Sequence, residues 1–111
     1  MNAMTDRLPE PIAAYYAAEK ADDFEALALC FAVDATVRDE GAVRTGRAAI
    51  AAWKAENKAR YRYETEVIDI REQDGAYLVS TRVSGSFPNS PVLLTQRFEL
   101  ADGEIRSLEI A

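Results

Sequence analysis

Histidine is absent from this 111-residue sequence, and cysteine occurs once, at Cys30. Without histidine, the chain cannot form a Ser-His-Asp or Cys-His nucleophile pair, an HExxH zinc site or a histidine proton shuttle. One cysteine cannot close an intramolecular disulfide or form a CxxC pair, and within an apolar helical stretch it is typical of a small core residue. The reaction classes that depend on these groups are therefore excluded.

Positive charge is scarce as well. The 13 Lys and Arg residues against 19 Asp and Glu residues leave a formal net charge of -6. Such a surface repels the phosphates of nucleic acids and offers no cationic stripe to anionic lipids, so we expect neither nucleic acid nor a membrane as a partner. Long apolar runs are missing too, because acidic residues interrupt the N-terminal region and no apolar run of about 18 residues follows. We therefore expect a cytoplasmic protein.

The rest of the composition is that of an ordinary globular protein. Hydrophobic residues make up 49% of the chain and charged residues 29%, close to average usage. A chain of 111 residues has the common size of one domain, and no repeat or low-complexity linker divides it. We therefore expect residues 1–111 to share a single core.

Helical spacing dominates the first half of the chain. Pro9 and Pro11 can initiate a helix. Three- and four-residue steps then connect Ile12, Tyr15, Tyr16 and Glu19. Asp22 followed by Glu25 is typical of a capping box, which predicts that Asp22 begins a short second helix. A third helix is predicted after Gly46, with a stripe of its own: Ile50, Trp53, Asn57 and Tyr61.

The second half of the chain is rich in β-branched and aromatic residues, in four runs: Tyr63–Arg71, Ala76–Phe87, Val92–Leu100 and Glu104–Ile110. Two hairpin dipeptides, Asp74-Gly75 and Asp102-Gly103, predict antiparallel neighbours. One earlier strand is predicted at Ala35–Asp39, before a turn at Glu40-Gly41. Three helices, one early strand and a four-stranded meander predict an α+β domain.

Several segments resemble the nuclear transport factor 2-like superfamily, particularly its SnoaL-like branch. The resemblance is carried by the string Asp34–Gly41, by Gly46–Ile50 and by Trp53. The closing pieces also look like that branch: Ser90-Pro91-Val92, Arg97-Phe98 and Asp102–Ile105. The resemblance implies a cone, in which a strongly curved, mostly antiparallel sheet wraps around three N-terminal helices. It also implies a mostly apolar pocket at one end and a homodimer.

Within this superfamily, the chain is similar to the ketosteroid isomerases at two positions that carry chemistry. The similarity implies that Asp39 is a general base, which removes a proton beside a carbonyl, and that Tyr15 donates a hydrogen bond to the developing enolate oxygen. Three positions depart from the isomerase pattern. The second oxyanion donor falls on Leu94, and the tyrosines that support the first donor fall on Phe31 and Lys54.

We expect the pocket to be lined from both halves of the chain. The expected lining residues are Tyr15, Phe31, Trp53, Val79, Leu94 and Phe98, with Arg47 at the mouth. Because a small domain needs most of its apolar side chains for its own core, we expect a volume of no more than roughly a few hundred Å³. Other interpretations stay open, since Tyr15 could be a core residue and Asp39 could form a surface ion pair with Arg47 or Arg38.

These residues leave two functional classes. The first is a non-catalytic module that holds a small, largely apolar ligand. The second is a cofactor-independent isomerase or cyclase that uses Asp39 and Tyr15. No metal site is expected in either class, because the dispersed acids Asp22, Asp23 and Asp34 lack the spacing of a metal-ligand set.

The pattern of apolar residues on the strands predicts a homodimer. Leu78 lies on the opposite face from Val79, and Ile105 on the opposite face from Leu108, so both faces of the sheet carry apolar side chains. We expect two copies to pair through the outer face and to bury roughly 1,000 Å² or more. Sedimentation at micromolar concentration tests this prediction. A species of 12.3 kDa alone would contradict it.

Overall fold

Three helices and six strands follow one another along residues 8–111, the part of the chain that the structure, a computed structural model, describes. The helices are α2 (Glu10–Lys20), α3 (Phe24–Leu29) and α4 (Arg47–Tyr61). The strands are β1 (Phe31–Asp39), β2 (Ala42–Thr45), β3 (Glu64–Gln73), β4 (Ala76–Ser84), β5 (Val92–Ala101) and β6 (Glu104–Ile110). None of these helices is long and apolar enough to cross a membrane. The predicted α+β class is confirmed.

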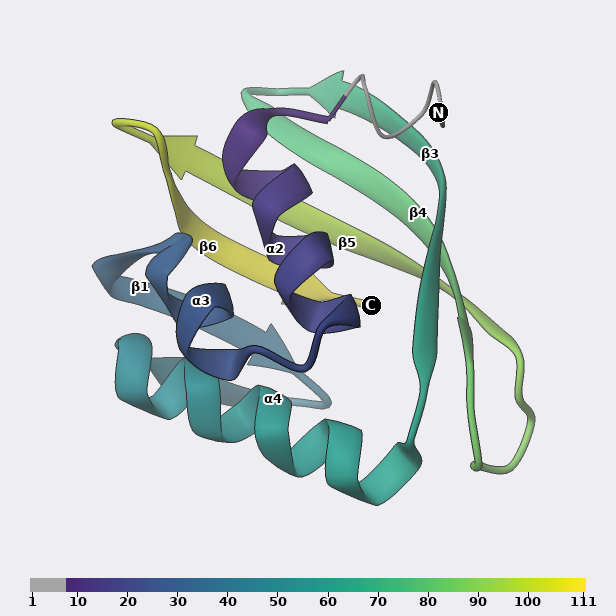
Figure 1. Ribbon diagram of the computed structural model, residues 1–111. Helices are drawn as coiled ribbons and strands as arrows, with labels where there is room; N and C mark the ends of the chain where they lie inside the picture. The colour runs from purple at the N-terminus through teal and green to yellow at the C-terminus, as the bar shows by residue number, and fades with distance from the viewer. Residues whose placement is uncertain (1–7) are drawn as a thin grey trace.

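The strands form one open sheet in the order β2-β1-β6-β5-β4-β3. The β1 and β6 strands run parallel and the other neighbouring pairs run antiparallel, so the expected mostly antiparallel sheet is confirmed. Figure 1 shows the sheet curving around α2, while α4 runs along the end of the sheet formed by β1 and β2. The sheet and the helices thus form the cone that the resemblance implies.

Tight two-residue turns explain the hairpins of this sheet. Both residues of Asp74-Gly75 and of Asp102-Gly103 have positive φ, as the predicted turn type requires. Glu40-Gly41 adopts the same conformation, with φ of 53° and 78°, and folds β2 back onto β1. The turn was predicted but β2 was missed, because the strand is short and a glutamate is an unusual first residue for such a turn.

The short helix α3 begins one residue later than predicted. Its N-cap is Asp23, whose carboxylate accepts a hydrogen bond from the Ala26 backbone N–H at 3.1 Å. The neighbouring Asp22 has a positive φ of 56°, and its carboxylate forms an ion pair with Lys58 at 3.1 Å. Two adjacent aspartates are equally suitable as caps, so the backbone conformation decides between them.

A β-bulge corrects the prediction for the last strand. Ile105 and Leu108 were expected on opposite faces, but both are buried in the core. Between Glu99 and Leu100 the register of β5 against β6 shifts by one residue, which brings side chains three positions apart to the same face. The outer face of the sheet is therefore less apolar than predicted, and the homodimer stays a prediction.

Aromatic rings fill one part of the cone. Tyr15 on α2 packs edge-on against Phe31 on β1 and Phe98 on β5, with ring centroids 5.8 and 5.6 Å apart. Val79 and Thr81 of β4 point inward and are fully buried. These buried side chains occupy the interior between α2 and the middle of the sheet.

Candidate functional site

A cavity of about 630 Å³ lies between α4 and the strands β3 to β6. Its lining residues are Glu19, Asp39, Glu40, Trp53, Lys54, Asn57, Tyr61, Tyr63, Thr65, Val83, Phe87, Pro88, Val92, Leu94, Gln96, Ile110 and Ala111. The cavity is larger than predicted from the sequence. Because the cavity is partly open to solvent, fewer side chains are needed to line it than to enclose it. The apolar core under α2 therefore remains intact.

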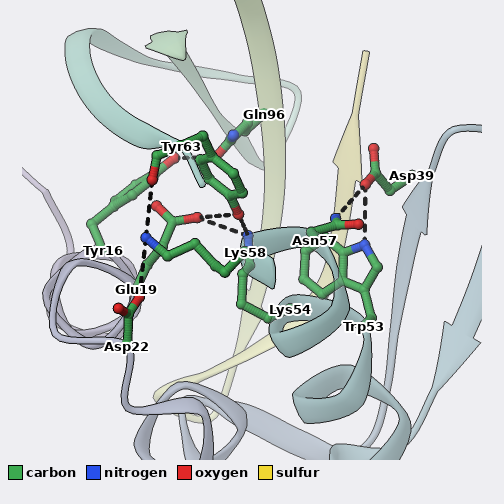
Figure 2. Close-up of polar contacts among 10 residues, drawn as sticks. All are labelled: Tyr16, Glu19, Asp22, Asp39, Trp53, Lys54, Asn57, Lys58, Tyr63 and Gln96. Atoms are coloured by element: carbon green, nitrogen blue, oxygen red, sulfur yellow. Dashed lines mark hydrogen bonds and ion pairs between the residues drawn. The ribbon is translucent and has the colours of Figure 1, made fainter. Parts of the chain in front are cut away.

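Asp39 lies at the end of β1 and is anchored through one carboxylate oxygen. Its Oδ2 accepts hydrogen bonds from Trp53 Nε1 at 3.0 Å and from Asn57 Nδ2 at 3.2 Å. These two donors are four residues apart on α4, so they lie on the same face of that helix (Figure 2). Within residues 8–111, the other oxygen, Oδ1, has no hydrogen-bond partner.

Neither arginine considered for Asp39 reaches its carboxylate. Arg47 forms an ion pair with Glu104 at 2.9 Å and donates to the Phe31 backbone carbonyl at 2.8 Å. The guanidinium of Arg38 lies 3.8 Å from Glu109 on the neighbouring strand. The carboxylate of Asp39 is therefore left to the cavity, and Arg47 does not lie at its mouth.

A buried ion pair lies at the inner wall of the cavity. Lys54 Nζ donates to Glu19 Oε2 at 2.7 Å and to the Tyr63 hydroxyl at 2.9 Å, and the same hydroxyl donates to Glu19 at 3.1 Å (Figure 2). The side chains of Glu19 and Lys54 are 4% and 3% exposed. Burial lowers the pKa of Lys54, although the Glu19 carboxylate opposes this shift. Burial, followed by the charge of Glu19, raises the pKa of Tyr63.

This cluster was missed in the sequence, although a signal was present. Glu19 belongs to the buried stripe of α2, and Lys54 lies beside Trp53 and four residues after Ile50, on the buried stripe of α4. A charged residue on the buried face of a helix needs a partner. One such residue of each sign, on two different helices, indicates an ion pair between them.

Tyr15 lies in the core rather than on the cavity. Its side chain is fully buried, and its hydroxyl has no hydrogen-bond partner within residues 8–111. Burial raises the pKa of this phenol well above its usual value. A molecule in the cavity does not touch the Tyr15 hydroxyl in this arrangement, so the geometry gives no support to Tyr15 as the donor.

The remaining predicted pocket residues divide in the same way. Trp53 and Leu94 line the cavity together with Asp39. Phe31, Val79 and Phe98 do not, which corrects the expected lining. These three side chains fill the part of the cone under α2, where close packing takes the space that a ligand would need.

Gln96 is a further polar side chain in the wall. It lies on β5 and is 3% exposed, and its carboxamide oxygen accepts a hydrogen bond from the Tyr16 hydroxyl at 2.5 Å. The sequence carries no sign of this contact, because the two residues are 80 positions apart. Within residues 8–111, no three His, Cys, Asp or Glu side chains cluster closely enough to hold a metal ion.

Comparison with known proteins identifies the family. The sequence profile of the SnoaL-like domain matches residues 12–108. The chain belongs to the SnoaL-like domain family. A candidate polyketide cyclase from Sinorhizobium meliloti is 39% identical to this SnoaL-like domain, with a TM-score of 0.93 and a match that covers 96% of this chain and 98% of that one. No curated protein matches the chain.

More distant structures share the fold. A hypothetical protein from Catenulispora acidiphila with a ketosteroid isomerase-like fold is 24% identical, with a TM-score of 0.81 and coverage of 93% of this chain and 85% of that one. An NTF2-like protein of unknown function from Cytophaga hutchinsonii is 14% identical, with a TM-score of 0.76 and coverage of 100% and 91%. The superfamily inferred from the sequence is therefore confirmed.

Two tyrosine variants of the SnoaL-like domain should behave oppositely. Tyr15→Phe removes a buried hydroxyl that has no partner within residues 8–111, so we expect the free energy of unfolding to stay the same or to rise by up to about 1 kcal/mol. Tyr63→Phe deprives Lys54 and Glu19 of a hydrogen bond each, so we expect a loss of about 1–3 kcal/mol. Urea denaturation measures both changes. A larger loss in Tyr15→Phe than in Tyr63→Phe would contradict the assigned contacts.

The SnoaL-like domain should lose stability in alkali. Burial raises the pKa of Tyr15, Tyr16 and Tyr63 in the folded state, whereas an unfolded tyrosine ionises near pH 10. A raised folded-state pKa contributes stability that is present below about pH 10 and is lost as the pH rises above it. The expected slope is about 1.4 kcal/mol per pH unit for each tyrosine. Urea denaturation from pH 9 to 11 measures this slope, which Tyr15→Phe should reduce; equal slopes in the two proteins would refute the prediction.

Proposed function

We propose that this SnoaL-like protein binds a small, largely apolar molecule in the cavity between α4 and the sheet. The observation that carries this proposal is the combination of apolar walls with the Asp39 carboxylate, whose Oδ1 has no hydrogen-bond partner within residues 8–111. Val83, Val92, Leu94 and Ile110 supply apolar surface from three strands, and Asp39 supplies the carboxylate. Such a surface suits a hydrocarbon skeleton that carries few polar groups.

The charges of the lining argue against an anionic ligand. Glu19, Asp39 and Glu40 are acidic, and the ammonium group of Lys54 is already paired with Glu19. Among the described lining residues there is therefore an excess of negative charge and no free cation to match a carboxylate or a phosphate. An anionic ligand would be repelled by these carboxylates.

A second function, proton transfer on the bound molecule, is favoured by the geometry of Asp39. Trp53 and Asn57 hold Oδ2, which fixes the orientation of the carboxylate and leaves Oδ1 able to accept a proton. Oδ1 would take a proton from a carbon next to a carbonyl, and the electron pair of the broken C–H bond would move to the carbonyl oxygen to give an enolate. No cofactor is needed for this step.

The enolate can react in two ways that balance in atoms and charge. If Asp39 returns the proton to a different carbon, the product is an isomer. If the enolate carbon attacks a second carbonyl of the same molecule, a ring closes and the new alkoxide takes the proton back from Asp39. The 39% identity to a candidate polyketide cyclase supports the second outcome.

The substitution Asp39→Asn tests the catalytic role. An amide keeps the shape of the side chain and an acceptor for Trp53 and Asn57, but it cannot take up a proton at neutral pH. With 3-cyclohexenone as the probe, we expect conversion to the conjugated enone to fall by about 10²–10⁴-fold. The absorbance of the product measures turnover, and the fluorescence of Trp53, the single tryptophan of the chain, reports binding.

Asp34→Asn is the matched control, because Asp34 is an exposed aspartate on the same strand, outside the cavity. This variant should convert the probe at the rate of the unaltered protein. Equal turnover in Asp39→Asn and the unaltered protein would refute the catalytic role. Binding without turnover in the unaltered protein would leave the ligand-binding function alone.

A further inference from the structure

Gln96 is buried in the cavity wall, and only the oxygen of its carboxamide has a hydrogen-bond partner within residues 8–111. Oε1 accepts a hydrogen bond from the Tyr16 hydroxyl, and Nε2 has no partner within residues 8–111. The side chain is 3% exposed. An amide nitrogen without a protein partner keeps two N–H groups available to a molecule in the cavity.

The Tyr16 contact shows which end of the amide is free. The Tyr16 hydroxyl faces Oε1 of Gln96, and a carboxamide oxygen can only accept a hydrogen bond. Tyr16 therefore donates to the carboxamide oxygen and holds the amide in one orientation. The two N–H groups of Gln96 are left as the groups that can serve a ligand.

The free amide nitrogen is accessible from the cavity. The fully buried side-chain polar atoms that lack a partner in residues 8–111 are the hydroxyls of Tyr15 and Thr65, and Nε2 of Gln96 is not among them. Since Gln96 lines the cavity and is otherwise buried, the accessible part of its amide faces the cavity. Gln96 therefore presents hydrogen-bond donors where the other walls present mainly apolar surface or carboxylates.

We propose that Gln96 donates a hydrogen bond to an acceptor oxygen of the ligand, and that the ligand is a neutral carbonyl compound. This inference rests on the proposed binding function and narrows its ligand class. A carbonyl oxygen accepts from Nε2, and its neutral skeleton suits the acidic, apolar cavity. If Asp39 forms an enolate, Gln96 stabilises the oxygen on which the charge develops, which is the role first expected of Tyr15. Tyr16 is a positioning residue, because it acts only through Gln96.

A matched pair of probes tests this inference. Cyclohexyl methyl ketone and isopropenylcyclohexane have nearly the same shape, but only the ketone has an acceptor oxygen. Trp53 fluorescence measures the dissociation constant of each probe. Because one hydrogen bond contributes about 1 kcal/mol or more, we expect the unaltered protein to bind the ketone roughly 5- to 10-fold more tightly than the hydrocarbon.

Three variants separate the hydrogen bond from packing. Gln96→Met keeps the length of the side chain but has no donor, so the two probes should bind equally while the affinity for the hydrocarbon changes little. Tyr16→Phe frees the amide to rotate, and the preference for the ketone should decrease. Gln73→Met makes the same change at an exposed position at the end of β3, and the preference should stay as in the unaltered protein.

Gln96→Met leaves the Tyr16 hydroxyl without a partner, so its folding is checked by urea denaturation. If it does not fold, the double variant Tyr16→Phe with Gln96→Met removes both partners and replaces it. A preference for the ketone that persists without Gln96, or tight binding of the hydrocarbon with no such preference in the unaltered protein, would overturn this inference alone. Failure of both probes to bind the folded protein would overturn the proposed function and this inference with it.

Discussion

The buried ion pair between Glu19 and Lys54 is the contact on which the arrangement of the site depends. Two opposite charges withdrawn from water are tolerated only when they satisfy each other closely, and removing either one would leave an unpaired charge in the interior. Because Glu19 belongs to α2 and Lys54 to α4, the pair fixes one helix relative to the other. Tyr63 joins both charges to the start of β3. The inner wall of the cavity is therefore held from three elements.

Three tyrosines near this ion pair differ in the partners of their hydroxyl groups because they differ in position. Tyr15 and Tyr16 are consecutive on α2 and therefore point about 100° apart around the helix. Tyr15 turns into the aromatic core and gives up its hydrogen bond, whereas Tyr16 reaches Gln96 on the sheet. Tyr63 completes the ion pair. Tyr15 and Tyr63 are buried and Tyr16 is half-buried, but of the three only Tyr16 and Tyr63 place a hydroxyl on a residue that lines the cavity.

The resemblance to the ketosteroid isomerases extends to the position of the base but not to the hydrogen-bond donors. By the resemblance of the sequence, Asp39 matches the position of their general base; in the structure it lines the cavity, anchored by Trp53 and Asn57. By the same resemblance, the positions of their oxyanion donors match Tyr15, which is a core residue here, and Leu94, whose side chain has no donor. The proposed donor, Gln96, comes from the same strand as Leu94 and two residues later, hence on the same face. In the proposed site, the base therefore matches that of the isomerases, whereas the residue that faces the oxygen differs.

The sequence by itself determined the class of fold, the order of nearly all elements and the position of Asp39, because these follow from local signals: helical stripes, β-branched runs, Asp-Gly turns and one motif around a turn. The missed strand β2 and the misplaced face of Ile105 depend on a turn and a bulge that such signals encode weakly. Only the tertiary structure decided which aromatic residues fill the core and which face the cavity. Glu19 and Lys54 carry a signal, as charged residues on the buried stripes of two helices, but only the tertiary structure paired them across 35 positions. It alone joined Tyr16 to Gln96, since a contact between residues 80 positions apart depends on how the elements pack and leaves no pattern along the chain.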